Sequence, residues 1–306
     1  MSGIGTDTYK FEGHFNGDGH IIYGLKVTDT TLKYGGLFGY VNGGTVKNIR
    51  FEGAYIKLQS GYVGIVCGFA NNSTLTTVIF DNCHTNGEVW CSEGAYVGGI
   101  VGYCNGCVNG SSADVTAYSG SDSDPGISQT CRVYVGGIAG TCTTITNCYV
   151  DGDVSAGGGN LYHHNSWVGG IVGSGGTISN CYSTATVTST TFQSSYCGGI
   201  AGKASTISNC FSTGNLKAKS YSKSNAHVGR IIGELEETDV IENCYADSTQ
   251  TCTQSSERYD NINSVTNSLG TLQFTQTLQS ENFIFNTLGW SSDVWQINEG
   301  AFPTLK

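Results

Sequence analysis

The chain has 306 residues, a formal net charge of −10 and only 14 Lys and Arg residues. Nucleic-acid binding depends on basic side chains, so this charge argues against a nucleic-acid partner. Hydrophobic residues make up 38% of the chain, and 17 Tyr, 12 Phe and 4 Trp favour a packed core over disorder. No apolar run approaches the roughly 18 residues of a membrane span, and the first residues lack the regions of a secretory signal. The chain is therefore expected to be cytosolic or a piece of a longer protein, without a membrane span.

A short hydrophobic element between glycines recurs from residue 35 onward, as in GGLFG at 35–39 and VGGIVG at 97–102. Its closing glycines are Gly39, Gly68, Gly102, Gly140, Gly173, Gly202 and Gly233. They follow one another at intervals of 29 to 38 residues. An element that returns at a spacing near 30 residues indicates a repeat architecture.

A second element, Asn-Cys followed by an aromatic residue, lies downstream of the glycines in the later repeats. Its cysteines are Cys148, Cys181, Cys210 and Cys244, and the segment 82–84 is an earlier version that reads Asn-Cys-His. Alternate residues after the element are small or β-branched, as in Val150, Gly152 and Val154. A period of two predicts β-strands, and nothing in these repeats has the 3.6-residue period of an amphipathic helix.

Short strands at this spacing, separated by Gly and Asn, predict a β-solenoid. Each repeat would be one coil of about three strands, which buries its apolar face only when the next coil stacks on it. Gly permits close backbone approach at corners, and Asn tolerates the left-handed conformation that a corner demands. A β-propeller is the competing fold, but its blades use roughly 40 residues each. The predicted fold class is therefore all-β, a parallel β-helix of about seven to nine coils.

The seven glycine elements resemble the GLUG repeat of secreted and surface-attached bacterial proteins, which include adhesins and proteins of the IgA-protease type. The opening segment resembles the start of such domains through Phe11, Phe15 and His20, and the ending resembles their closing segment through Trp295 and Pro303. The resemblance covers nearly the whole chain. It implies a right-handed parallel β-helix with a C-terminal cap, a cell-surface setting, and neither catalytic residues nor a cofactor.

This resemblance also divides the chain into two parts. Residues 1–252 would form the solenoid, with an incomplete N-terminal cap at 1–32, and residues 253–306 would form a C-terminal capping segment. The chain departs from the family pattern in three ways: its cap is already under way at residue 1, Arg230 replaces a motif glycine, and cysteines are numerous.

The thirteen cysteines are open to three interpretations. Cys104 and Cys142 each lie two residues after a motif glycine in neighbouring repeats, so they form a candidate disulfide. Cys91 and Cys131 form a looser candidate pair. The cysteines of the Asn-Cys element predict an inward ladder of thiols instead, since buried Cys behaves as a small hydrophobe. A metal site is disfavoured because Cys104 and Cys107 alone have ligand spacing.

Enzymes are also built on β-helices, and the chain offers one acidic pair for such chemistry. Asp151 and Asp153 lie two residues apart, so one strand face would present both carboxylates. Two carboxylates can serve glycoside hydrolysis, yet an exposed strand face is normally polar. None of the four arginines lies next to these acids in the sequence. A polysaccharide-active enzyme is therefore the least favoured function.

The segment GGGNLYHHNSW at 157–167 is a Gly-rich excursion and a candidate recognition loop, although a solvated turn is the plainer interpretation. Its side chains of interest are Tyr162, His163, His164 and Trp167. Loops rich in Tyr, Ser, Asn and Gly suit polar recognition, and exposed aromatic rings suit stacking on sugars. The chain is thus predicted to be a non-catalytic extracellular or cell-surface adhesin or spacer whose partner is a glycan or a host or cell-surface protein. The alternative is a structural filament subunit that self-associates through the ends of its solenoid.

Overall fold

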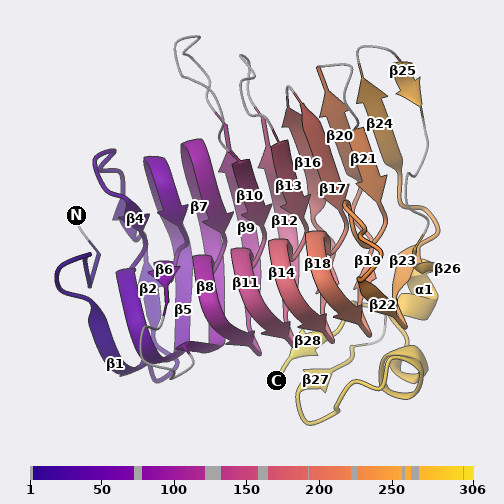
Figure 1. The fold of residues 1–306 in the computed structure, drawn as a ribbon. Coiled ribbons are helices and arrows are strands. Elements are labelled where there is room, and N and C mark those ends of the chain that lie inside the picture. The colour runs from indigo at the N-terminus through magenta and orange to yellow at the C-terminus, as the bar shows by residue number, and fades with distance from the viewer. Residues whose placement is uncertain are drawn as a thin grey trace.

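The computed structural model describes residues 3–71, 78–120, 132–157, 165–191, 193–221, 226–256, 259–262, 269–298 and 300–306. Its strands wind into coils that stack side by side, from the indigo N-terminal end in Figure 1 to the orange coils at the other end. Most pairings join a strand in parallel to its counterpart one coil later. The fold is the predicted all-β solenoid of parallel, stacked coils.

The coils align their strands in three rows. The first row ends at the glycine element of each repeat and contains β4 (Tyr34–Gly35), the ends of β5 (Phe38–Val63) and β7 (Val78–Gly98), β10 (Arg132–Gly136), β13 (Asn165–Gly169), β17 (Ser194–Gly198) and β21 (Ala226–Gly229). The second row follows the glycine element and contains β1 (Phe11–Asn16), the starts of β5 and β7, β6 (Cys67–Ala70), β8 (Val101–Asn109), β11 (Ala139–Thr146), β14 (Val172–Ser179), β18 (Ala201–Ser208) and β22 (Val240–Glu242).

The third row follows a corner at the end of the second row. It contains β2 (Ile21–Tyr23), β3 (Lys26–Val27), the middle parts of β5 and β7, β9 (Ser112–Ser119), β12 (Tyr149–Ala156), β15 (Tyr182–Ser183), β16 (Thr186–Thr191), β19 (Phe211–Ser212), β20 (Leu216–Ser220), β23 (Tyr245–Asp247), β24 (Cys252–Ser256) and β26 (Thr271–Gln273). Only β25 (Tyr259–Ile262) pairs antiparallel to this row among the described strands, through β24.

The glycine element makes the sharp turn between the first and second rows. Val101, Ala139 and Val172 are Cα partners in the second row, and a closing glycine follows each of them. A Cβ atom added to Gly140 would lie 2.6 Å from the backbone nitrogen of Val97 in the preceding coil. Real Cβ contacts are not this short, so the position requires glycine because the first-row backbone passes directly against it.

A stack of left-handed residues forms the corner between the second and third rows. These residues have φ angles between 48° and 54° and are Asp18, Asn48, Asn82, Gly110, Asn147, Asn180, Asn209 and Asn243. The amides bond from coil to coil: Asn82 Nδ2 donates to Asn48 Oδ1 at 2.9 Å, and Asn243 Nδ2 donates to Asn209 Oδ1 at 2.8 Å. Asn suits this corner because it tolerates a positive φ and carries both a donor and an acceptor.

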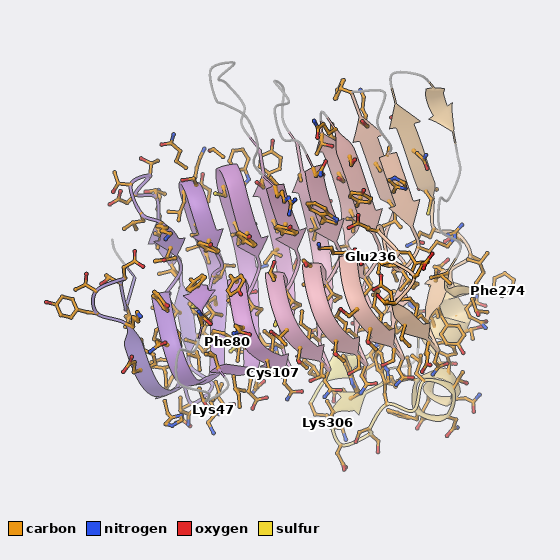
Figure 2. All side chains as sticks on the ribbon, viewed as in Figure 1. Lys47, Phe80, Cys107, Glu236, Phe274 and Lys306 are labelled. Atoms are coloured by element: carbon orange, nitrogen blue, oxygen red, sulfur yellow. The ribbon has the colours of Figure 1, made fainter. Side chains whose placement is uncertain are left out.

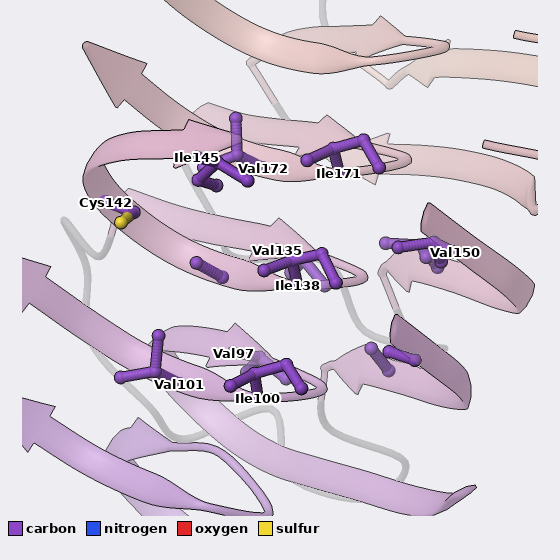
Figure 3. Close-up of a cluster of buried hydrophobic side chains, with 14 of the residues drawn as sticks. Val97, Ile100, Val101, Val135, Ile138, Cys142, Ile145, Val150, Ile171 and Val172 are labelled. Atoms are coloured by element: carbon purple, nitrogen blue, oxygen red, sulfur yellow. The ribbon is translucent and has the colours of Figure 1, made fainter. Parts of the chain in front are cut away.

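The interior is a continuous column of apolar side chains and thiols. Figure 3 shows Ile100, Ile138 and Ile171 repeating from coil to coil, and all three are fully buried. The cysteines of the Asn-Cys element also lie inside: Cys83, Cys148, Cys181, Cys210 and Cys244 are buried free thiols. Ser111 takes the equivalent position in the coil between Cys83 and Cys148, where its Oγ accepts the Cys83 N–H at 3.0 Å.

The N-terminal segment already pairs as a coil. The strands β1, β2 and β3 each pair in parallel with β5. The rings of Phe11 and Phe15 pack on the buried ring of Phe38, with centroid separations of 4.9 and 5.4 Å. Residues 11–27, expected as part of an incomplete cap, therefore add strands to the solenoid and bury its first apolar layer.

The C-terminal segment lies along the flank of the third row. It contains α1 (Thr275–Leu278), η1 (Asn282–Thr287), β27 (Trp295–Gln296) and β28 (Thr304–Leu305), and Figure 1 shows it in yellow, folded back beneath the last coils. Tyr182 Oη donates to the carbonyl of Pro303 at 2.7 Å, and Trp290 Nε1 donates to the carbonyl of Asn209 at 2.9 Å. The segment expected to cap the last coil thus covers the side of several coils.

Solenoid pairing also continues past residue 252, the expected boundary. β24 pairs with β20 in the preceding coil, and β26 pairs with β23. Of the described residues, neither α1 nor η1 forms a helix long and apolar enough to cross a membrane.

Candidate ligand-binding face

One outward position in the first row is aromatic in every coil. We call the resulting surface the aromatic stripe; its first-row members are Tyr34, Tyr62, Tyr96, Tyr134, Trp167, Tyr196 and His227. Each is followed by a buried Gly, Val or Cys, such as Val97 after Tyr96. Because side chains alternate across a strand, the buried neighbour turns the aromatic residue outward.

The rings of the aromatic stripe stack on one another along the solenoid. Centroids of consecutive rings from Tyr62 to His227 lie 4.8 to 5.5 Å apart, with interplanar angles of 9° to 19°. Parallel strands in register place equivalent side chains about 4.8 Å apart, which is near the spacing of stacked rings. The stack therefore follows directly from the coil repeat.

A second aromatic series runs beside the first in the N-terminal half of the stripe. Its members are Tyr40, Phe69 and Tyr103, which belong to the second row and complete the aromatic stripe. The Phe69 and Tyr103 rings stack at 4.9 Å, and Tyr62 meets Phe69 edge to face at 4.8 Å. The next partners in register after Tyr103 are Thr141, Ser174 and Lys203. The aromatic surface is therefore widest between Tyr34 and Tyr103.

Exposure and charge differ between the two halves of the stripe. Tyr62, Tyr96 and Tyr103 are partly exposed, whereas Tyr134 is 8% and Trp167 is 5% exposed. Lys203 Nζ lies 4.9 Å from the Trp167 ring centroid and 5.8 Å from that of Tyr134, so a cation covers these rings. Trp167 Nε1 donates to Glu234 Oε2 at 2.6 Å. Tyr196 and His227, beyond this covered pair, are partly exposed again. The longest accessible stretch of the stripe is thus its N-terminal half, from Tyr34 to Tyr103.

The local environment raises the pKa of several stripe phenols and lowers that of the stripe histidine. Burial raises the pKa of Tyr96, and burial together with the hydrogen bond to Asp7 raises the pKa of Tyr34. Burial lowers the pKa of His227, against the smaller opposing effect of Glu234. The consecutive first-row rings cover one another's faces in the stack, which leaves their edges as the accessible surface. Such a surface offers hydrogen bonds and apolar contact together.

Trp167 belongs to the stripe, while Tyr162, His163 and His164 lie outside the described residues. Cys104 and Cys142 are Cα partners on adjacent strands, as their spacing predicted; both are free thiols here, and a disulfide between them stays a prediction.

The acidic pair also occupies the predicted arrangement. Asp151 and Asp153 are both exposed on the outer side of β12. Within the described part of the chain, no three His, Cys, Asp or Glu side chains are grouped so that they could hold a metal ion. Thr184 Oγ1 donates a hydrogen bond to Asp151 Oδ1 at 2.9 Å.

The aromatic stripe itself was missed in the sequence, although its signal is present. The residue before the Val-Gly or Cys-Gly of the repeats is Tyr at 62, 96, 134 and 196, Trp at 167 and His at 227. The residue at this position changes between repeats, whereas the glycines are the same in each. A comparison of repeats by identical residues therefore does not detect the aromatic position. The signal is an aromatic ring at the same position of successive repeats in this chain.

Comparisons with known proteins agree with this architecture. Residues 164–188 match the family described as the GLUG motif, which bears out the resemblance found in the sequence. A segment of 68 residues is 38% identical to a protein of Evansella cellulosilytica that is named as a Gly-rich membrane protein; it makes up 21% of this chain and 8% of that protein. A crystal structure from Bacteroides ovatus, named for an immunoglobulin A1 protease, aligns with 98% of this chain and 79% of its own at a TM-score of 0.59 and 21% identity. At this identity the structural likeness shows the fold alone.

Proposed function

We propose that this GLUG-motif β-solenoid is a non-catalytic surface or secreted module that binds a glycan along the N-terminal half of its aromatic stripe. The observation that carries the proposal is the double series of partly exposed rings between Tyr34 and Tyr103. Other strongly exposed apolar side chains, such as Tyr9 at 81%, are not part of such an array. A contiguous aromatic surface on a soluble fold marks an interaction site.

The chemistry of the stripe favours a polyhydroxylated ligand. Phenol hydroxyl groups donate and accept hydrogen bonds, and the rings add apolar contact area beside them. Tyr is also a favoured recognition residue because it supplies large contact area at low conformational-entropy cost. The regular ring spacing of 4.8 to 5.1 Å from Tyr62 to Tyr134 suits an extended chain that repeats its contacts from coil to coil.

The surface or secreted setting is supported by the GLUG match and by the relative named as a membrane protein. The protease name belongs to the structural neighbour, and we carry no reaction over from it. Apart from the aromatic position of the stripe, the features that recur along the repeats are the glycine turn, the corner between the second and third rows and the buried column, and all three serve packing. The proposal therefore assigns recognition, rather than a reaction, to this chain.

A glycan array followed by affinity measurements tests the proposal. The wild-type chain is expected to bind at least one glycan class, and Tyr62→Ala and Tyr103→Ala are each expected to weaken that binding about tenfold or more, because central aromatic residues dominate binding energy. Phe274→Ala is the matched control: Phe274 is 71% exposed and projects from the far end of the molecule (Figure 2).

Thermal unfolding of each variant separates a loss of binding from a loss of fold. Absence of glycan binding by the folded wild-type chain would contradict the proposal. So would binding that neither stripe variant changes.

A further inference from the structure

We propose a second and separate binding site, for neutral carbohydrate, in a groove on the outer side of the third row. The groove is an open depression with a volume of about 640 Å³. It crosses β5, β7, β9 and β12 and shares no residue with the aromatic stripe. Nothing in the proposed stripe function depends on it.

Bends in consecutive strands form the floor of the groove. Gly53 is an extra residue in β5, since Phe51 and Thr85 are partners and the next aligned pair is Ala54 with Gly87. The φ angles of Gly53 and Gly152 are 63° and 100°. Glycine allows these bends because other residues are strained at such angles, and the absence of side chains leaves the floor open.

Two columns of outward side chains form the walls. One column carries Asn86 of β7 and Asp114 of β9 in register, and Asp151 of β12 continues it beyond the groove lining. The other column lies two residues further along the same strands and carries Glu88, Thr116 and Asp153, with Tyr55 of β5 at its start. All these side chains except Tyr55 are exposed, and Tyr55 is partly exposed.

Hydrogen bonds fix the first column and leave acceptors free in the second. Asn86 Nδ2 donates to Asp114 Oδ2 at 3.0 Å, and Asp151 Oδ1 accepts the Gly152 N–H at 2.8 Å. The side chains of Glu88 and Asp153 make no hydrogen bond to any described residue. Their carboxylates are strong acceptors, so a ligand in the groove must donate hydrogen bonds.

The negative charge of the groove lining favours neutral over acidic ligands among those that donate hydrogen bonds. Glu88, Asp114 and Asp153 line the groove, and the lining contains no Lys, Arg or His. Lys26, which is outside the lining, has its Nζ 5.9 Å from the Tyr55 ring centroid. Acidic sugars would be repelled, whereas the hydroxyl groups of a neutral sugar supply the required donors. The Tyr55 ring adds an apolar surface of the kind that sugars contact.

Calorimetric titration of the whole chain with neutral and uronic-acid oligosaccharides tests the inference. Neutral oligosaccharides are expected to bind and uronic-acid oligomers are not. Glu88→Gln and Asp153→Asn each keep the shape of the groove but remove a charged acceptor, and each is expected to weaken binding about tenfold or more. Asp293→Asn, which changes an exposed acid in the C-terminal segment, is expected to leave binding unchanged.

A further variant keeps this site distinct from the stripe. Tyr62→Ala should retain binding in the groove, so that failure of one site does not imply failure of the other. The inference is overturned if uronic-acid oligomers bind as well as neutral ones, or if no neutral oligosaccharide binds. It is also overturned if Ca²⁺ alone binds tightly and both acid variants abolish that binding.

Discussion

At the residue scale, each corner asparagine has a backbone and a side-chain role. Asn180 has a φ angle of 53°, its Nδ2 donates to Asn147 Oδ1 at 3.3 Å, and its Oδ1 accepts from Asn209 Nδ2 at 3.3 Å. A left-handed conformation costs most residues roughly 1–2 kcal/mol, which Asn and Gly largely avoid. The corner therefore depends on the conformational tolerance of Asn and on its amide.

Replacing Asn180 separates these two roles. Asn180→Ala is expected to lower the free energy of unfolding by about 1–3 kcal/mol, because Ala loses both the amide bonds and the tolerance for positive φ. Asn180→Gly keeps the conformation and loses only the amide bonds, so its effect should be smaller. Urea unfolding measures both. Equal losses for Ala and Gly would contradict the backbone part of this explanation.

The thiols differ in their access to reagents. Burial, with neighbouring thiol and carboxylate groups, raises the pKa of Cys107 to about 11, whereas Cys104 is buried, with its pKa raised by the hydrogen bond with Cys142 and by burial. Cys107, labelled in Figure 2, is partly exposed. The thiolate is the reactive form, so the rate of alkylation depends both on the thiolate fraction and on the exposure of the sulfur atom.

Alkylation with iodoacetamide, followed by mass spectrometry, tests this difference. Below its pKa, the thiolate fraction of Cys107 rises about tenfold per pH unit, so its labelling should be slow at pH 7 and should accelerate up to about pH 11. Cys104 and Cys142 should react only when urea unfolds the chain. Rapid labelling of Cys107 at pH 7 would show that its thiol is not perturbed as described.

At the element scale, the closing glycines decide whether the first and second rows can meet. A Cβ on Gly140 would lie 2.6 Å from the nitrogen of Val97 and from the carbonyl oxygen of Gly102. Both atoms are backbone and cannot move aside independently. A side chain at Gly140 would therefore require the backbone of the neighbouring coil to move.

Gly140→Ala is expected to lower the free energy of unfolding by about 1–3 kcal/mol or more through overpacking. Gly13→Ala in β1 is the matched control, because its added Cβ would meet only the Phe11 ring, at 3.8 Å. That variant should be neutral or slightly stabilised, since Ala restricts the unfolded chain. Thermal melts of both variants check the difference, and similar melting temperatures would argue against steric exclusion at Gly140.

The sequence was most informative about these repeated elements. The glycine turn and the Asn-Cys corner recur with the same residues, so their period predicted the coils, the inward thiols and the register of Cys104 with Cys142. The aromatic stripe was not predicted from the sequence because Tyr96, Trp167 and His227 are different residues at equivalent positions of their repeats. The groove was not predicted either, because the bend at Gly53 comes from an extra residue in one strand. A repeat pattern does not show such an insertion.

At the scale of the whole molecule, the C-terminal segment fastens several coils together. Tyr182 and Pro303, which share a hydrogen bond, are 121 positions apart in the sequence. Trp295 is fully buried and packs with Tyr182 and Phe211 in one cluster. No periodic pattern encodes such a contact, which explains why the sequence predicted a cap where the structure has a cover along the flank.

Removing residues 275–306 should expose the stacked rings of Tyr149, Tyr182 and Phe211, whose centroids lie 5.2 and 4.9 Å apart. Loss of this buried aromatic area is expected to lower the melting temperature and to create binding of a hydrophobic dye. Trp295→Ala should act in the same direction, at a cost of about 3–5 kcal/mol. An unchanged melting temperature after truncation would mean that the coils do not depend on this cover.

The central claim is that the N-terminal half of the aromatic stripe binds a glycan. Hydroxyl-radical footprinting with and without an array-selected glycan tests it most directly, since the method reports which aromatic rings a ligand covers. We expect the glycan to protect Tyr62, Phe69 and Tyr103 from oxidation and to leave the oxidation of Phe274 unchanged. Protection confined to other parts of the chain, or no protection at a saturating glycan concentration, would contradict it.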